Sequence, residues 1–168
     1  MKGKAAQSRR QSVDAVLDQF RNGNRDSEQA YELIKKLENE DISSIVDALD
    51  QLSDILCQAT YFTKAYEILS VAVKDIQGNP VLHELIARVA FVMENFEKSI
   101  QHNKRAAQLQ PENCAHNYSD IGLAYYRLGV KMQNVKYFDT AFKYCKQSIE
   151  DNKINPKAMV NMGLIFKQ

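Results

Sequence analysis

The sequence predicts an all-α fold built from stacked helical hairpins, and two observations carry this prediction. Small residues recur at a fixed spacing: Ala65 and Ser99 are 34 residues apart, and so are Ala72 and Ala106. Around them, apolar residues follow the three- and four-residue spacing of amphipathic helices. A fixed period of this length is typical of arrays in which each hairpin buries its apolar face only against its neighbours.

Three segments, residues 49–73, 83–107 and 118–149, share one pattern. Each has an apolar helix of about four turns, a short break, an aromatic residue, and a small residue three positions later. The aromatic residue wedges the turn, and the small residue lets the two helices of a hairpin approach closely. These pairs are Phe62 with Ala65, Phe96 with Ser99, and Phe138 with Ala141.

Composition narrows the class of protein. The chain has 168 residues, 45% of them hydrophobic and 26% charged, which fits one globular domain. It contains no apolar run of the ~18 residues that a membrane span requires. Its three cysteines are odd in number and widely spaced, so we expect reduced thiols in an intracellular, cytoplasmic protein.

Charge is segregated along the chain, although the net charge is only +1. Residues 1–25 carry six basic and two acidic side chains, and residues 26–54 carry two and nine. Residues 127–168 carry eight basic and three acidic side chains. An acidic block and a distant basic block predict oppositely charged regions, or solvated helix faces.

The N-terminal part is read in two pieces. Residues 1–12 are basic without an apolar pattern, which predicts a flexible tail. Residues 13–45 show helical spacing on either side of a break and predict a degenerate repeat or, as we favour, a capping hairpin. Ser27 and Asp41 are the expected N-caps of two helices.

Two glycines flank a tyrosine pair in the stretch 122–129. Gly122 falls where a first helix crosses its partner, so the sequence predicts that it is small for packing. Gly129 falls where that helix would ordinarily stop. The distance from Gly129 to Phe138 exceeds the repeat spacing by seven residues, or close to two turns, which predicts longer helices there.

The best-defined segment resembles the tetratricopeptide repeat (TPR) family, which follows the pattern W-x2-L-G-x2-Y, then A-x3-F, then P. The matching residues are Tyr118, Ile121, Gly122, Tyr125, Ala141 and Cys145, then Met159, Met162, Gly163 and Phe166, with Pro111 as a helix-ending proline. The resemblance implies a right-handed α-solenoid over residues 46–168. Its repeats would be 46–79, 80–113, 115–155 with an insert, and 156–168 as a partial repeat or solvating helix.

In TPR proteins, the first helices of successive hairpins line a concave groove that holds a partner peptide. Carrying those places over implies a groove that is acidic at one end and apolar in the middle. Such a groove suits a peptide or protein partner with basic and apolar residues. His116, Asp120 and Lys157 also fall at groove places. The peptide-binding residues implied are Asp47, Asp50, Asp54, Glu84, Leu85, Arg88, Phe91, Ser119, Leu123, Tyr126, Arg127, Val160 and Asn161.

No catalytic, cofactor or metal site is predicted. His83 begins "HELIA" but no histidine follows four residues later, so the zincin pattern is not met. The leading hypothesis is therefore a non-enzymatic adaptor or scaffold. A bacterial secretion-type TPR chaperone is one alternative, and self-association through the terminal repeats stays open. A helical-repeat RNA binder is disfavoured because acidic groove residues oppose phosphate contacts, so no nucleic acid is expected.

Overall fold

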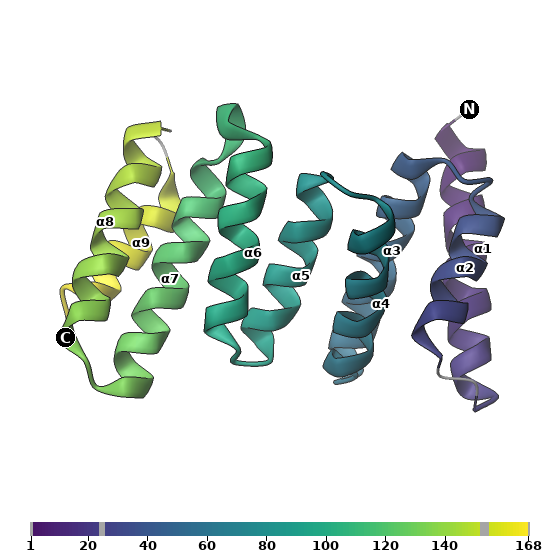
Figure 1. The fold of residues 1–168 in the computed structure, drawn as a ribbon, viewed down its shortest axis with the longest axis horizontal. Helices are drawn as coiled ribbons and strands as arrows, with labels where there is room; N and C mark the ends of the chain where they lie inside the picture. The colour runs from purple at the N-terminus through teal and green to yellow at the C-terminus, as the bar shows by residue number, and fades with distance from the viewer. Residues whose placement is uncertain (1, 24–25, 152–154, 168) are drawn as a thin grey trace. The chain divides into compact units, whose positions relative to one another are not determined.

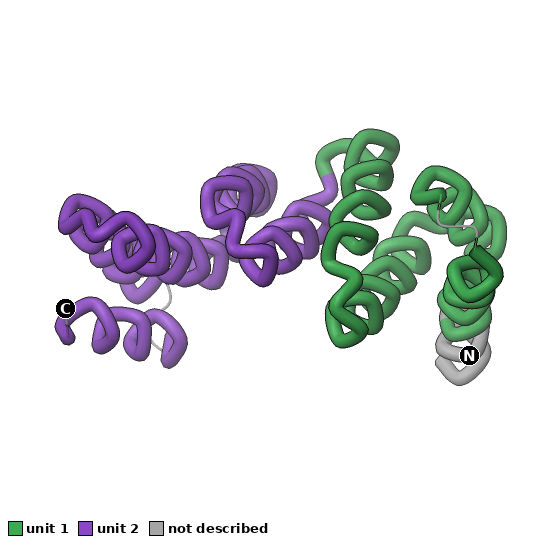
Figure 2. Tube along the Cα trace, turned by 90° about the horizontal axis from the view of Figure 1, so that it is seen from below, with its two compact units in different colours: residues 1–78 green, residues 79–168 purple. Residues whose placement is uncertain are grey.

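The structure is a computed structural model that describes residues 2–23, 26–151 and 155–167, with side chains from Arg10 onward. Within these ranges the chain forms nine α-helices and one short 3-10 helix, and no strand (Figure 1). The predicted all-α class is confirmed. The chain divides into two compact units, Met1–Gly78 and Asn79–Gln168, here called unit 1 and unit 2 (Figure 2).

Unit 1 contains four helices that enclose one core. They are α1 (Lys2–Arg21), α2 (Ser27–Leu37), α3 (Ile42–Gln58) and α4 (Phe62–Asp75). Both α1 and α4 pack on α2 and α3, whereas α2 and α3 share few contacts. Each helix contributes at least one side chain that is almost fully buried, such as Val16, Ile34, Leu49 and Ile68. The division at Gly78 groups the segment 46–78 with the N-terminal hairpin.

Polar contacts reinforce the packing of unit 1. The hydroxyl of Ser12 on α1 donates to Oε1 of Glu38 at 2.6 Å, and both side chains are buried. Tyr31 on α2 donates to Oδ2 of Asp75 at 2.8 Å, and Nζ of Lys35 lies 2.9 Å from the same oxygen. Burial, followed by this hydrogen bond, raises the pKa of Tyr31. These contacts fix α2 to the end of α4.

The start of the chain differs from the prediction of a flexible tail over residues 1–12. Residue 1 and the side chains before Arg10 lie outside the described part, but the backbone helix α1 begins at Lys2. The apolar pattern begins only at Val13, so periodicity predicted a later start. Residues 2–12 are nevertheless rich in Ala, Lys, Arg and Gln, which have high helix propensity.

The two predicted N-caps have different outcomes. Asp41 caps α3, since its carboxylate accepts a hydrogen bond from the backbone N–H of Ser44 at 2.8 Å. The prediction for Ser27 is wrong, because Asp26 caps α2 and accepts from two backbone N–H groups. Ser27 instead donates to Glu67 of α4 at 3.0 Å. A tertiary contact takes the hydroxyl that a local rule had assigned to the cap.

Unit 2 contains two complete hairpins and a further helix. Its elements are α5 (Pro80–Val92), α6 (Phe96–Leu109), η1 (Pro111–Asn113), α7 (Ala115–Met132), α8 (Val135–Asp151) and α9 (Pro156–Ile165). Helix α6 packs on α5 and α7, and α8 packs on α7 and α9 (Figure 1). A core cluster joins α6 to α7 and contains Phe96, Ile100, Ile121, Ala124 and Leu128.

The helices near the insert are longer, as predicted, but the predicted role of Gly129 as a helix end is wrong. Helices α7 and α8 have 18 and 17 residues, against 13 and 14 in α5 and α6. Gly129 does not end α7, which continues to Met132 and closes at Gln133 with a left-handed φ of 50°. A Cβ at Gly129 would lie 2.6 Å from the ring of Phe138. Gly129 is therefore small because this ring packs against the helix.

Candidate functional site

The predicted groove residues fall in both units, and each unit's share is described by itself. Asp47, Asp50 and Asp54 lie on α3 of unit 1, on one side of the helix because of their spacing. Asp47 and Asp54 are exposed, and Asp50 is half-buried. The other predicted residues lie on α5, α7 and α9 of unit 2. The first-helix face, as we call it, consists of Glu84, Leu85, Arg88, Phe91, Ser119, Leu123, Tyr126, Arg127, Val160 and Asn161.

A carboxylate on this face bridges α5 and α7. Oε1 of Glu84 lies 2.8 Å from Nε2 of His116 and accepts a hydrogen bond from Nδ2 of Asn117 at 3.2 Å. Glu84 and His116 are half-buried, and Asn117 is buried. The negative charge of Glu84 is therefore balanced within the unit.

The pKa directions agree with this contact. Burial acts to raise the pKa of Glu84, but the hydrogen bonds from His116 and Asn117 outweigh it, so this pKa is lowered. The hydrogen bond to Glu84 raises the pKa of His116, although burial acts in the opposite direction. Each partner thus favours the charged form of the other.

A second pair of contacts joins α7 to α9. Lys157 forms an ion pair with Asp120. Nδ2 of Asn161 donates to the backbone oxygen of Ser119 at 3.1 Å and lies 3.3 Å from its Oγ. Ser119 and Asn161 are both buried. These two predicted binding residues therefore hold the helices together and present no open side chain.

The aromatic residues of the face are anchored on one edge. Phe91 packs edge-to-face on Phe96, with ring centroids 5.3 Å apart. Tyr126 lies 5.9 Å from the ring of Phe138. Phe91, Leu123 and Tyr126 are half-buried, so part of each side chain stays open to solvent. Leu85, by contrast, is buried in the core.

The remaining face residues, Arg88, Arg127 and Val160, are exposed. The sequence did not predict the hydrogen bond that Asn117 donates to Glu84. The repeat period places Glu84 near residues 116–118, but only side-chain packing decides which of these turns toward it.

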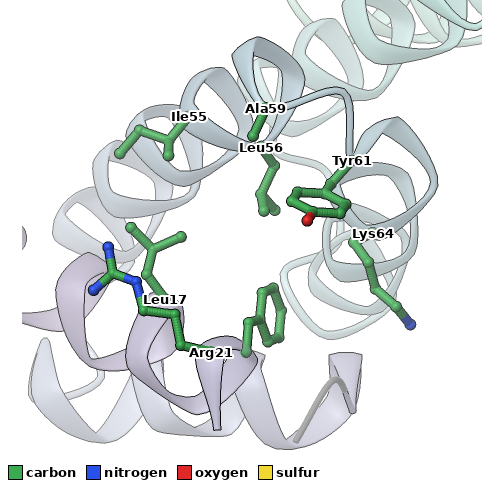
Figure 3. Close-up of a pocket in the computed structure, with 8 residues that line it drawn as sticks. Leu17, Arg21, Ile55, Leu56, Ala59, Tyr61 and Lys64 are labelled. Carbon is green, nitrogen blue, oxygen red and sulfur yellow. The ribbon is translucent and has the colours of Figure 1, made fainter. Parts of the chain in front are cut away.

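Unit 1 holds an apolar cavity that sequence reasoning also missed. Its volume is about 290 Å³, and its lining comes from the end of α1, the end of α3 and the start of α4 (Figure 3). The pattern at Leu17 and Phe20 predicted an apolar helix face, but it carries no signal that the face is left partly uncovered. We call this cavity the α1–α3 pocket; it is lined by Leu17, Phe20, Arg21, Ile55, Leu56, Ala59, Tyr61 and Lys64.

Cys145 is buried, and burial raises its pKa to about 11, which opposes thiolate chemistry. Within the described ranges, no three His, Cys, Asp or Glu side chains gather where they could hold a metal ion. No helix in this part of the chain is both long and apolar enough to cross a membrane.

No protein-family model matches the sequence, and no curated protein matches it. Solved structures do match its fold. Pseudomonas aeruginosa PilF superposes with a TM-score of 0.63 at 20% identity, over 98% of this chain and 70% of that protein. A TPR protein of Thermus thermophilus gives 0.63 at 15% identity, over 95% and 81% of the two chains. A tetratricopeptide repeat protein of Parabacteroides merdae has a TM-score of 0.62 at 18% identity, over 96% of this chain and 60% of that protein. At these identities the likeness concerns the fold, and this chain has the fold of tetratricopeptide repeat proteins.

Proposed function

We propose that this protein is a non-enzymatic scaffold and that the first-helix face of unit 2 binds a segment of a partner protein. One observation carries the proposal: Phe91, Leu123 and Tyr126 stay partly open on helices that polar contacts hold in place. Apolar anchors on a rigid support bind with a small entropic cost, because little has to be ordered on binding. The fold shared with TPR proteins supports this proposal.

The paired charges refine the chemistry of the partner. In unit 2, Glu84 and Asp120 already contact His116 and Lys157, so the acidic groups of this face are engaged. The face offers its apolar anchors beside the exposed Arg88 and Arg127. In unit 1, Asp47, Asp50 and Asp54 form an acidic row on α3 that favours basic residues. A partner with both apolar and basic residues suits the two surfaces.

The test uses the full chain as bait, with captured proteins quantified by mass spectrometry. Phe91→Ala and Tyr126→Ala should each weaken binding of the main partner by roughly 1–3 kcal/mol and speed dissociation, because buried aromatics dominate interfaces. Gln101→Ala is the matched control, since Gln101 is exposed on the second helix α6. Circular dichroism must show that all variants keep their helices.

A reversed pattern would contradict the groove assignment. If the two aromatic substitutions leave binding unchanged while Gln101→Ala weakens it, the second helices carry the interaction.

The acidic row has its own test on the same partner. Replacing Asp47, Asp50 and Asp54 together by Asn should slow association and flatten its salt dependence, with a smaller effect on dissociation. An unchanged salt dependence would remove these residues from the binding surface. Stopped-flow or surface-based kinetics at several ionic strengths give the measurement.

Self-association through the terminal helices is supported by exposed apolar side chains on and just after α9, including Met159, Val160 and Phe166. Lysines of the basic C-terminal block oppose it by like-charge repulsion. Light scattering over a range of protein and salt concentrations tests this part of the proposal.

A further inference from the structure

We infer that the α1–α3 pocket of unit 1 binds an apolar side chain of a partner protein that is flanked by acidic residues. This inference goes beyond the proposed function and does not rest on it, because the pocket shares no residue with the first-helix face.

The cavity has the size and lining for one apolar group. Its volume of about 290 Å³ exceeds the roughly 150 Å³ that is enough to hold benzene in an apolar protein cavity. Leu56 is buried at its base, whereas Ile55 on its wall is 38% exposed. Water finds few partners on such a surface, so an apolar side chain is the favoured occupant.

The charged residues that line the pocket are basic, so they favour a partner side chain with acidic neighbours. Of the ionisable side chains that line it, Arg21 and Lys64 are cationic, and no carboxylate is among the described residues of the lining. Figure 3 shows Leu56 and Tyr61 directed into the opening, with the charged ends of Arg21 and Lys64 directed away from its centre. The stems of these two residues therefore cover apolar surface while their charges stand at the rim.

Both cations have donors to spare. Nη1 of Arg21 pairs with Asp18 at 2.7 Å, and Nζ of Lys64 pairs with Glu67. A guanidinium carries five N–H donors and an ammonium three, so each can bind a further carboxylate. The ion pair between Arg21 and Asp18 is strongly exposed, so it stabilises the position of the guanidinium only weakly. Carboxylates beside an apolar side chain of the partner would meet these two groups.

The test uses the full chain labelled with nitrogen-15 and three synthetic peptides. These are acetyl-Asp-Phe-Asp-amide, acetyl-Asn-Phe-Asn-amide and acetyl-Lys-Phe-Lys-amide. We expect amide shift changes on α1, α3 and α4 around the pocket. The acidic peptide should bind about fivefold more tightly than the neutral one, and the basic peptide most weakly.

Three variants locate the binding. Ala59→Leu fills the cavity from its wall and should abolish binding of all three peptides. Arg21→Gln with Lys64→Gln should remove the preference for the acidic peptide and leave the neutral peptide unaffected. Lys36→Gln, an exposed lysine on α2 that does not line the pocket, should behave as the wild type.

Other outcomes overturn the inference. No shift changes around the pocket, or binding that survives Ala59→Leu, would show that the cavity is not the site. Equal affinities for the three peptides would show that Arg21 and Lys64 do not select acidic neighbours. Thermal unfolding of each variant shows that a loss of binding is not a loss of fold.

Discussion

At the scale of single residues, the clearest link from sequence to packing is Gly122. A glycine inside a helix costs about 1 kcal/mol relative to alanine, so its place in α7 needs a reason. A Cβ there would lie 2.5 Å from Sγ of Cys145 and 3.1 Å from the backbone oxygen of Ala141. The absence of a side chain lets α7 and α8 approach, as the sequence predicted.

Gly122→Leu should therefore destabilise the protein by about 1–3 kcal/mol or more, because overpacking displaces neighbouring groups. Thermal or urea unfolding measures the change. The matched control is Gly163→Leu, since a Cβ at this α9 position meets no atom within 4 Å. The control should be neutral or slightly stabilising. Equal losses in the two variants would show that helix contact around Gly122 is not the cause.

At the scale of helices, the sequence predicted helix caps and lengths that depend on residues close in the chain. The cap at Asp41 follows from nearby residues, and the insert after Gly129 predicted the longer α7 and α8. The tight contact at Gly122 joins two helices, and it was predicted from the position of Gly122 in the repeat.

The cap of α2 is also local, but it is made by Asp26, one residue before the predicted Ser27. The end of α7 was not predicted, because Gly129 receives the Phe138 ring and the helix continues past it. The Phe138 ring is supplied by α8, so no helix-end rule applied to α7 contains it.

The contact between α5 and α7 should depend on pH in a defined direction. The folded-state pKa of His116 is raised above its ordinary value of 6.5, chiefly by Glu84. Its stabilisation is thus fully present below that ordinary value and is lost as the pH rises through the raised pKa. Glu84→Gln should cost more stability at about pH 5.5 than at about pH 8.5.

Proton NMR of the three histidines separates this effect from general destabilisation. In Glu84→Gln, the pKa of His116 should fall toward its ordinary value. His102, whose pKa burial lowers to about 4, contacts His83 and should not change. If the pKa of His116 is the same in the wild type and in Glu84→Gln, the contact between these side chains is absent in solution.

At the scale of the whole molecule, the sequence period predicted which positions are equivalent but not which helices share a core. Residues 46–79 carry the repeat landmarks Phe62 and Ala65, so periodicity joined them to the array. In the structure, α3 and α4 pack on α1 and α2 within unit 1. The same limit applies to the candidate site: the TPR resemblance placed Ser119 and Asn161 among the groove residues, but both side chains are buried and Asn161 donates to Ser119.

The division into units leads to a prediction about folding. A fragment of residues 79–168 should fold alone, because it keeps the α6–α7 core cluster and the Asn79 side chain that caps α5. The preceding Gly78 has a φ of 79° and lies outside every helix, so cutting there breaks no helical hydrogen bond.

The matched comparison is a fragment of residues 46–168, the array that periodicity predicted. It adds most of α3 and all of α4 without α1 and α2, so apolar residues such as Leu49 and Ile68 lose the helices that bury them. This longer fragment should therefore be no more stable than 79–168 and more prone to aggregate. Circular dichroism and urea unfolding of both fragments give the answer. If 46–168 unfolds cooperatively while 79–168 is unstructured, the segment 46–78 belongs energetically to the array and the boundary at Gly78 is not a folding boundary.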